Sequence, residues 1–374
     1  MTKLEQLAEL GQAVWLDFIR RSLITSGKLQ ALVDEGLRGM TSNPTIFEQA
    51  IAGNDDYDQD LQRLVVGIRS VTQIYEALAM DDIRRAADVL RPVYNATDGI
   101  DGYVSLEVNP QLAHDTAGTV AEARRLFAAL GRPNVMIKVP ATPAGIPAIR
   151  TLIGDGVNIN VTLIFSLDHY RAVTEAYISG LEDLAAGGGI LSQAASVASL
   201  FVSRIDTAVD KALDSRVGNA QSPESDAQSP KGKIAIATAK AAYGLFGEIF
   251  AGERWEHIAT QGARVQRPLW ASTSTKNPAY PDTLYVDTLI GPHTVNTLPP
   301  ATLDAFRDHG AVALTLEAGL DEARAQLAHL TDLGIDLAAI TQKLQDDGVA
   351  AFARSFDSLL SSIEEKCERL RNDW

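Results

Sequence analysis

The most constraining feature of this sequence is a repeated alternation between short apolar runs and longer stretches with helical periodicity. Short apolar or alternating runs are typical of strands, and apolar residues at three- and four-residue spacing are typical of helices. This alternation indicates parallel βα units. The candidate strands are residues 14–19, 37–42, 102–108, 134–139, 157–164, 192–198, 268–272 and 284–288. Eight such units predict an α/β protein whose sheet closes into a (β/α)8 TIM barrel.

The stretches between these strands supply the expected helices. Clear helical periodicity covers residues 117–130, 168–185, 200–214 and 235–251. A doubly wound nucleotide-binding sheet is the competing architecture, but it needs a glycine-rich turn directly after an early strand. The glycine-rich segments here precede a strand, at 154–156, or follow a helix, at 187–189. The barrel is therefore favoured.

Composition along the chain indicates the domain organisation. Residues 215–233 are rich in Ser, Gln, Pro, Asp and Gly, which suits a solvated surface loop better than a domain linker. Residues 316–374 are helical in pattern and highly charged, which predicts a C-terminal helical extension outside the barrel. We expect residues 1–374 to form a single barrel domain with extra terminal helices.

Strand parity directs several polar side chains into the barrel. Side chains alternate between the two faces of a strand, so one parity faces the surrounding helices and the other faces the interior. On the fourth expected strand this pattern turns Lys138 inward, and on the third it turns Glu107 inward. The first, second and fifth strands contribute Asp17, Asn43, Asn160 and Thr162.

Prolines mark where these strands end. Asn43 is followed directly by Pro44, and Lys138 stands two residues before Pro140. Because proline cannot donate to a strand ladder, the polar groups lie at strand carboxyl ends, where barrel enzymes build their active sites. Taken alone, Lys138 fits a structural ion pair with Glu107 equally well. The convergence of so many polar groups at one barrel mouth predicts an enzyme.

These residue types suit Schiff-base chemistry. An amine among apolar strand residues has its charged form disfavoured, so neutral Lys138 becomes available to attack a ketone. The protonated imine withdraws electrons, so a neighbouring carbon–carbon bond can break. Glu107, acting through a water held by Thr162, suits the proton transfers. The base for the departing hydroxyl is expected to be Asp17, with Asn43 and Asn160 bonding the substrate hydroxyls.

This chemistry needs no metal and no cofactor, and the sequence disfavours a metal site. The six histidines include no ligand-like pair at helical spacing. The lone cysteine, Cys367, excludes a cysteine-based cluster. Neither a Walker phosphate loop nor a nucleophile elbow is present.

Charge and composition limit the partners and the location. The chain has 48 acidic and 33 basic residues, and its net charge of −15 repels nucleic acid and anionic membranes. One cysteine cannot form an internal disulfide, which suits a reducing compartment. The first ten residues lack the apolar core of a secretory signal, and no apolar run reaches the ~20 residues of a membrane span. We expect a cytoplasmic protein without nucleic-acid or membrane partners, as a monomer or homodimer.

Several long segments resemble motifs of the transaldolase family in order and spacing. They are GMTSNPTIF at 39–47, VSLEV at 104–108, IKVPAT at 137–142 and NINVTLIFS at 158–166. The resemblance extends from about Asp17 to Leu289, and the chain length is similar to the longer bacterial subfamily. It implies a barrel of the class I aldolase type, with Lys138 as the Schiff-base lysine on the fourth strand.

The resemblance implies the same roles for the other residues above and adds a substrate-binding group. In SLFVSR at 199–204, it implies a substrate contact by Ser199 and phosphate binding by Arg204. In WASTSTKNP at 270–278, it implies a contact by Ser272, and Lys276 holds the position of a second phosphate-binding cation. A bidentate guanidinium suits a phosphate ester.

The implied activity is that of a transaldolase in the pentose phosphate pathway. Sedoheptulose 7-phosphate and glyceraldehyde 3-phosphate would give erythrose 4-phosphate and fructose 6-phosphate. One alternative is a fructose 6-phosphate aldolase-like lyase, but that relative carries glutamine and tyrosine where this chain has Glu107 and Phe201. The other is a non-catalytic sugar-phosphate-binding barrel, which would be expected to have lost Lys138 or Glu107. Both are retained.

Overall fold

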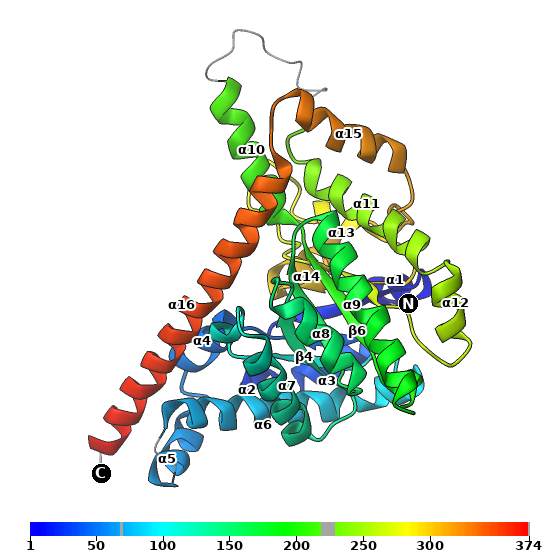
Figure 1. Cartoon of the computed structure of the whole chain (residues 1–374). Coiled ribbons are helices and arrows are strands. Elements are labelled where there is room, and N and C mark those ends of the chain that lie inside the picture. The colour runs from blue at the N-terminus through cyan, green and yellow to red at the C-terminus, as the bar shows by residue number, and fades with distance from the viewer. Residues whose placement is uncertain (68–69, 218–228, 373–374) are drawn as a thin grey trace.

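A computed structural model describes residues 1–67, 70–217 and 229–372 (Figure 1). Its centre is a closed barrel of parallel strands in the order β1 to β8, each paired with its neighbour in sequence and β8 paired with β1. The predicted (β/α)8 barrel is confirmed. The strands are β1 Gln12–Asp17, β2 Gly39–Thr41, β3 Tyr103–Glu107, β4 Val135–Pro140, β5 Ile159–Ile164, β6 Ser196–Phe201, β7 Arg267–Ala271 and β8 Thr294–Leu298.

Helices surround the barrel and extend beyond it at the C-terminal end (Figure 1). Those up to the middle of the chain are α1 Lys3–Glu9, α2 Arg21–Thr25, α3 Lys28–Asp34, α4 Pro44–Ala52, α5 Asp58–Gly67, α6 Val71–Ala96, η1 Pro110–Leu112, α7 Thr116–Leu130, α8 Gly145–Gly154 and α9 Leu167–Ala186. The others are η2 Leu191–Gln193, α10 Ser203–Val217, α11 Ile234–Ile249, α12 Glu253–Ala259, α13 Leu284–Asp287, α14 Pro300–His309, α15 Leu320–Asp332 and α16 Leu337–Asn372.

The prediction of the eighth strand was wrong. Residues 284–288 lie in and after the short helix α13, and the strand that closes the barrel is β8, ten residues later. A brief apolar run has too few residues to reveal its period, so helix and strand are hard to tell apart. The true strand was harder to find because Thr294, Asn296 and Thr297 interrupt its apolar residues, although all three are buried.

The sixth strand was predicted too early along the chain. The expected segment 192–198 begins in the η2 turn, and β6 starts only at Ser196. It continues to Phe201, so the next helix, α10, begins at Ser203 and not at the expected residue 200. This shift places Ser199 inside a barrel strand, where its side chain is buried.

The predicted loop and C-terminal extension have different outcomes. Of the predicted loop at 215–233, residues 218–228 lie outside the described residues. The stretch from 316 contains α15 and α16, and α16 packs against α4, α5, α6, α10 and β5. We propose on these contacts that the whole chain is one barrel domain. No described helix is by itself long and apolar enough to cross a membrane, although the bent pair α11 and α12 meets those criteria jointly.

Alternating side-chain direction along the strands positions the polar residues. The expected outward residues of β4, Val135, Ile137 and Val139, are fully buried beneath the helices. Lys138 lies between them on the opposite parity, and its side chain faces the interior with only 5% of its surface exposed. The helices thus cover one face of each strand. The side chains of the other face point into the barrel, and those near the strand carboxyl ends reach its mouth.

Candidate active site

Strand register brings a lysine and a glutamate together at the barrel mouth. Glu107 at the end of β3 pairs with Lys138 on β4, and Lys138 pairs with Asn160 on β5. The Lys138 Nζ lies 3.7 Å from Glu107 Oε2, and both side chains are buried. Lys138 Nζ also donates to the Ser42 carbonyl at 3.3 Å. The amine is therefore held between a carboxylate and a main-chain carbonyl, with little contact with solvent.

Glu107 is poised to exchange a proton near neutral pH. Its Oε2 is buried without a hydrogen-bond partner, since 3.7 Å to Lys138 is too long for one. Burial raises the pKa of Glu107 to about 7, with Lys138 opposing the shift and the charge of Asp17 adding to it. A carboxyl with this pKa is populated in both protonation states at neutral pH, which suits a general acid and base.

Asp17, at the end of β1, is oriented by threonine hydroxyls. Thr41 Oγ1 donates to Asp17 Oδ1 at 2.6 Å, and the Thr41 and Thr297 hydroxyls are 3.0 Å apart. These contacts come from three adjacent strands, β8, β1 and β2, so the barrel fixes the carboxylate. Asp17 and Lys138 line the same cavity.

The Asn160 amide is fixed by hydroxyls on its two sides. Its Nδ2 donates to Ser105 Oγ at 3.1 Å, and its Oδ1 accepts from Ser199 Oγ at 2.7 Å. Two residues along β5, Thr162 is fully buried and its Oγ1 has no hydrogen-bond partner. A buried hydroxyl of this kind is a natural anchor for a water molecule.

A cavity of about 370 Å³ at the mouth contains most of the predicted site. The predicted residues that line it are Asp17, Asn43, Lys138, Ser199, Arg204, Ser272 and Lys276. Glu107, Asn160 and Thr162 are not among the lining residues and lie deeper, beside Lys138 on β3 and β5. Asn43 has a structural role as well, because its Oδ1 accepts from the Ile46 amide and caps α4.

Two cations lie at one side of this cavity without a carboxylate partner among the described residues. Arg204, in the first turn of α10, stacks over the Phe201 ring with 5.4 Å between guanidinium and centroid. Burial lowers the pKa of Arg204, and partial loss of hydration together with the charge of Arg204 lowers the pKa of Lys276. Mutual repulsion of this kind is relieved by an anion bound between the two groups.

Backbone strain occurs beside these cations. Ser272, which follows β7, has a left-handed φ of 55°, unusual for a residue other than glycine. Its hydroxyl lies 3.0 Å from that of Ser203, at the start of α10. Lys276 Nζ donates to Ser274 Oγ at 2.5 Å. Strained backbone that surrounding structure maintains is concentrated at functional sites, which agrees with hydroxyls being held here for a ligand.

Comparison with known proteins identifies the family. The model of the transaldolase/fructose-6-phosphate aldolase family matches residues 14–363. The chain belongs to this family. Transaldolase from Parafrankia sp. (strain EAN1pec) is 49% identical, with 97% of each chain covered, and Thermobifida fusca transaldolase is 49% identical over 97% of this chain and 98% of its own. Transaldolase from Trichodesmium erythraeum is 45% identical over 98% of this chain and 97% of its own.

The family match extends well beyond the resemblance seen in the motifs, which ended near Leu289, and includes most of α16. That helix contributes Phe352 to the site. Its ring centroid lies 6.0 Å from Lys138 Nζ, and the residue lines the active-site cavity. Sequence reasoning missed Phe352 because an apolar residue in a helical stripe is ordinarily a packing residue.

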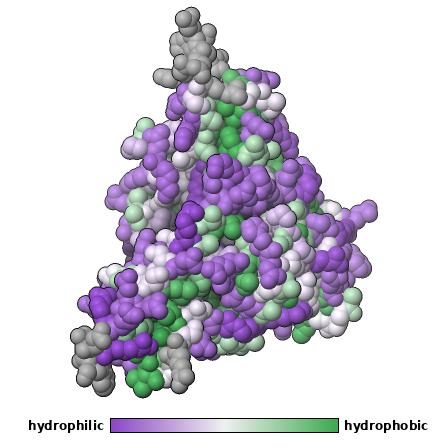
Figure 2. Space-filling view, turned by 60° about the vertical axis from the view of Figure 1, so that its left-hand side comes forward, coloured by the Kyte–Doolittle hydropathy of each residue, from purple (hydrophilic) through white to green (hydrophobic). Residues whose placement is uncertain are grey.

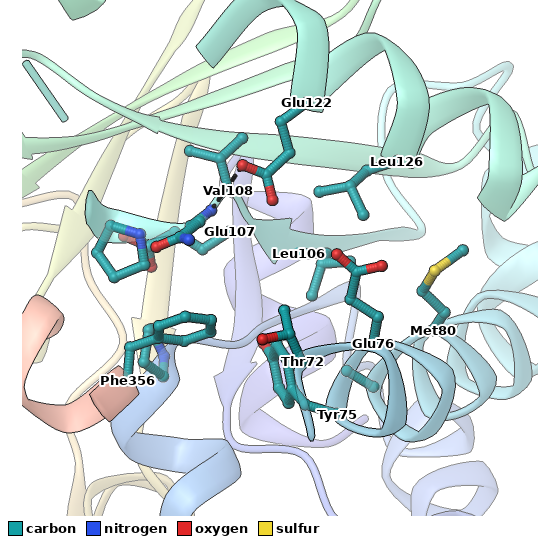
Figure 3. Close-up of a pocket in the computed structure, with 14 residues that line it drawn as sticks. Thr72, Tyr75, Glu76, Met80, Leu106, Glu107, Val108, Glu122, Leu126 and Phe356 are labelled. Carbon is teal, nitrogen blue, oxygen red and sulfur yellow. Dashed lines mark hydrogen bonds between the residues drawn. The ribbon is translucent and has the colours of Figure 1, made fainter. Parts of the chain in front are cut away.

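A second, much smaller cavity lies behind Glu107, between β3 and helices α6, α7 and α16 (Figure 3). Its volume of about 20 Å³ is enough for one water molecule. Glu76, Glu122 and Tyr75 surround it, and Phe356 closes it from α16. Burial, together with the negative charges of Glu107 and Glu122, raises the pKa of Tyr75. Its Glu76 and Glu122 carboxylates contact Arg125, at 2.6 and 3.8 Å, so among the described residues Lys138 is the cation within 4 Å of Glu107.

The donor set argues against a metal in the described part of the chain. In residues 1–67, 70–217 and 229–372, no group of three His, Cys, Asp or Glu side chains is arranged to hold a metal ion. The main groups at the mouth are an amine, two carboxyls, amides and hydroxyls. This set can form and break an imine.

Proposed function

We propose that the chain is a transaldolase that carries a dihydroxyacetone unit on Lys138. It converts sedoheptulose 7-phosphate and glyceraldehyde 3-phosphate to erythrose 4-phosphate and fructose 6-phosphate, a step of the pentose phosphate pathway. The full-length relatives named transaldolase support the activity. The observation that carries the mechanism is the buried amine 3.7 Å from a carboxyl with a pKa of about 7.

Imine formation is the first step of the proposed mechanism. Neutral Lys138 Nζ attacks the ketone carbon of the donor, giving a carbinolamine. Glu107 passes a proton to the ketone oxygen as the attack occurs, then takes the surplus proton from nitrogen and gives it to the hydroxyl, which leaves as water. The unpartnered hydroxyl of Thr162 supports a role in holding the water that carries these protons. The C=N bond that results is protonated and draws electrons from its neighbours.

Cleavage and transfer follow from the imine. Asp17 removes the proton of the C4 hydroxyl, the C3–C4 bond breaks, and the electron pair enters the imine to give an enamine. The aldehyde product leaves. The acceptor aldehyde then binds, the enamine carbon attacks it, and Asp17 returns its proton to the new alkoxide. Hydrolysis of the product imine, the reverse of its formation, frees the ketose and Lys138. The hydrogen bond from Thr41 supports this role because it holds the carboxylate in one orientation.

The remaining residues are proposed to hold the sugar phosphate. Arg204, Lys276 and Ser272 suit the phosphate, since both cations face the cavity without a described carboxylate partner and the hydroxyl lies beside them. Asn43, Asn160 and Ser199 suit the hydroxyls of the three-carbon unit. The Asn160 amide is already fixed by two hydroxyl contacts, so little side-chain entropy remains to be lost on binding.

Borohydride trapping tests the covalent mechanism. Reduction in the presence of fructose 6-phosphate is expected to fix a three-carbon adduct on Lys138, located by mass spectrometry of peptides. Lys366 is a matched internal control, because it is the other lysine buried among the described residues and contacts Asp58 away from the mouth. Adducts on another lysine, or full activity in Lys138→Ala, would reject the mechanism.

Product analysis separates the transferase from the lyase of the same family. With fructose 6-phosphate and erythrose 4-phosphate together, we expect sedoheptulose 7-phosphate as the main product. With fructose 6-phosphate alone, free dihydroxyacetone should accumulate only slowly. Dominant release of dihydroxyacetone in the presence of the acceptor would assign the lyase activity instead. We also propose a cytoplasmic location, supported by the single, buried cysteine Cys367.

A further inference from the structure

The long helix α16 crosses the mouth of the barrel with an apolar stripe turned inward. In Figure 1 it runs from the α10 end of the molecule past α4 to α5. Figure 2, which brings this side forward, shows hydrophilic residues over most of the face, with hydrophobic residues gathered toward its lower end. The buried positions of the helix recur at helical spacing: 341, 345, 348, 349, 352, 356, 359, 363, 366 and 367.

Gln345 fastens this helix to the strand that carries the lysine. Its Nε2 donates to the carbonyl of Ala141, directly after β4, at 2.9 Å, and to that of Leu163 on β5 at 3.1 Å. Gly348 permits the close approach, because a Cβ there would lie 2.9 Å from Leu163 Cδ2. Leu163 itself has a left-handed φ of 60°. The helix is thus attached to two strand ends beside Lys138.

Phe352 follows Gln345 by two helical turns, which places it on the same face of α16. Its side chain is 5% exposed, lines the active-site cavity and has its ring centroid 6.0 Å from Lys138 Nζ. The polar neighbours of the amine come from the barrel strands and the loop after β2, namely Glu107 and the Ser42 carbonyl. The Phe352 ring is the aromatic neighbour of the amine, and it takes up space in the cavity beside Nζ that water would otherwise fill.

We propose that Phe352 determines whether the three-carbon unit is transferred or released. This inference rests on the proposed function, because it concerns the intermediate on Lys138. Release requires protonation of the enamine carbon and addition of water to the imine carbon. The C–N bond of the carbinolamine then breaks, its electron pair returns to Nζ, and the hydroxyl proton leaves through Glu107. The water consumed equals the water lost when the imine formed.

The ring acts on protonation of the enamine carbon, the step that only release requires, and not on bond cleavage. Shielding by Phe352 lowers the access of water to the enamine, and the face of an aromatic ring also favours a nearby cationic nitrogen. The enamine therefore persists until an aldehyde acceptor arrives. Phe352 is a shielding residue in this proposal, and the chemical steps stay with Lys138, Glu107 and Asp17.

Phe356 provides a matched control one turn further along α16. It is the same residue type with similar burial, 4% exposed, but it lines the small cavity in Figure 3 and packs edge-on against Tyr75 at 5.5 Å. Phe352→Ala and Phe356→Ala remove the same atoms from the same helix. We expect similar losses of stability, with only Phe352→Ala altering the fate of the intermediate.

The experiment measures the ratio of free dihydroxyacetone to transferred product, with fructose 6-phosphate as donor and erythrose 4-phosphate as acceptor. We expect the ratio to rise about tenfold in Phe352→Ala and to stay unchanged in Phe356→Ala. Phe352→Leu keeps an apolar side chain and the fold, and should give a smaller rise in this ratio. If the alanine variant does not fold, the leucine variant supplies the test.

Borohydride trapping in each variant separates failure of the shielding role from failure of the proposed function. An adduct on Lys138 in wild type and Phe352→Leu, with equal product ratios, would overturn the shielding role and leave the proposed function standing. Absence of any adduct in wild type would overturn the proposed function itself. An equal rise in both alanine variants would assign the effect to general loosening of α16 and also overturn the specific role of Phe352.

Discussion

Two buried charge clusters in this protein are built in opposite ways. Lys138 and Glu107 at the barrel mouth stand 3.7 Å apart, and Glu107 Oε2 has no hydrogen-bond partner. Arg21, at the start of α2, instead contacts the carboxylates of Asp60, Asp81 and Asp82. Tyr57 completes that second cluster: its hydroxyl donates to Asp82 at 2.7 Å and accepts from the Arg21 amide at 3.0 Å.

The difference lies in the number of carboxylates that contact each buried cation, which is one for Lys138 and three for Arg21. A buried charge surrounded by partners contributes to structure, and its removal leaves the partners uncompensated. A buried charge held loosely beside a cavity retains lone pairs and protons for a substrate. Both clusters contain buried charged side chains, so burial alone does not identify the site. The following changes test whether the distinction holds.

The largest effect is expected for Lys138→Met. This change removes the amine and keeps an unbranched side chain, so activity should fall on the order of 10⁴-fold or more while the protein still folds. Lys366→Met, at a lysine that contacts Asp58, should keep full activity. Steady-state kinetics and circular dichroism measure both. If Lys138→Met instead lost folded structure while its folded fraction kept normal specific activity, Lys138 would be a structural charge like Arg21.

Glu107→Gln should lower activity by about 10²- to 10⁴-fold, the usual contribution of a general acid and base. In wild type, kcat/KM should rise with pH through about 7, the pKa of Glu107. Below that pH Glu107 is protonated and cannot accept a proton from the amine. This fall in kcat/KM at low pH should be absent in Glu107→Gln. If the fall persists near pH 7 in that variant, another group causes it.

Arg21→Met should act on stability and leave the chemistry unchanged. The substitution removes the charged partner of the fully buried Asp82 carboxylate, whose pKa burial already raises. It should lower the free energy of unfolding by about 3–5 kcal/mol. The neighbouring Arg20→Met removes a partly exposed ion pair with Asp56 and should cost less than about 1 kcal/mol. Denaturant titration compares them. Equal losses in the two variants would mean that partner number does not distinguish these charges.

The sequence predicted the barrel and its polar mouth because both depend on local periodicity. Parity alone turned Lys138 and Glu107 inward, and the structure brings them together across adjacent strands. Periodicity failed where a strand carries polar residues, as in β8, and where an apolar run is very short, as in α13. Phe352 could not be found in this way, because its contact with Lys138 joins residues 214 positions apart through the path of α16.

The smallest effect is expected for Lys276→Met, which extends the comparison to the phosphate end. Like Lys138, Lys276 faces the cavity, and its described side-chain contact is a neutral hydroxyl, Ser274 Oγ. If it binds phosphate, removing it should raise KM for sugar phosphates about tenfold with little change in kcat, since the phosphate lies away from the reacting carbons. Arg204 remains to hold the anion, so binding is weakened and not abolished. Dihydroxyacetone-containing donors without a phosphate should show no change in KM. A rise in KM for those donors too would mean that Lys276 shapes the cavity instead of binding the anion, and its loose contacts would then have no functional meaning.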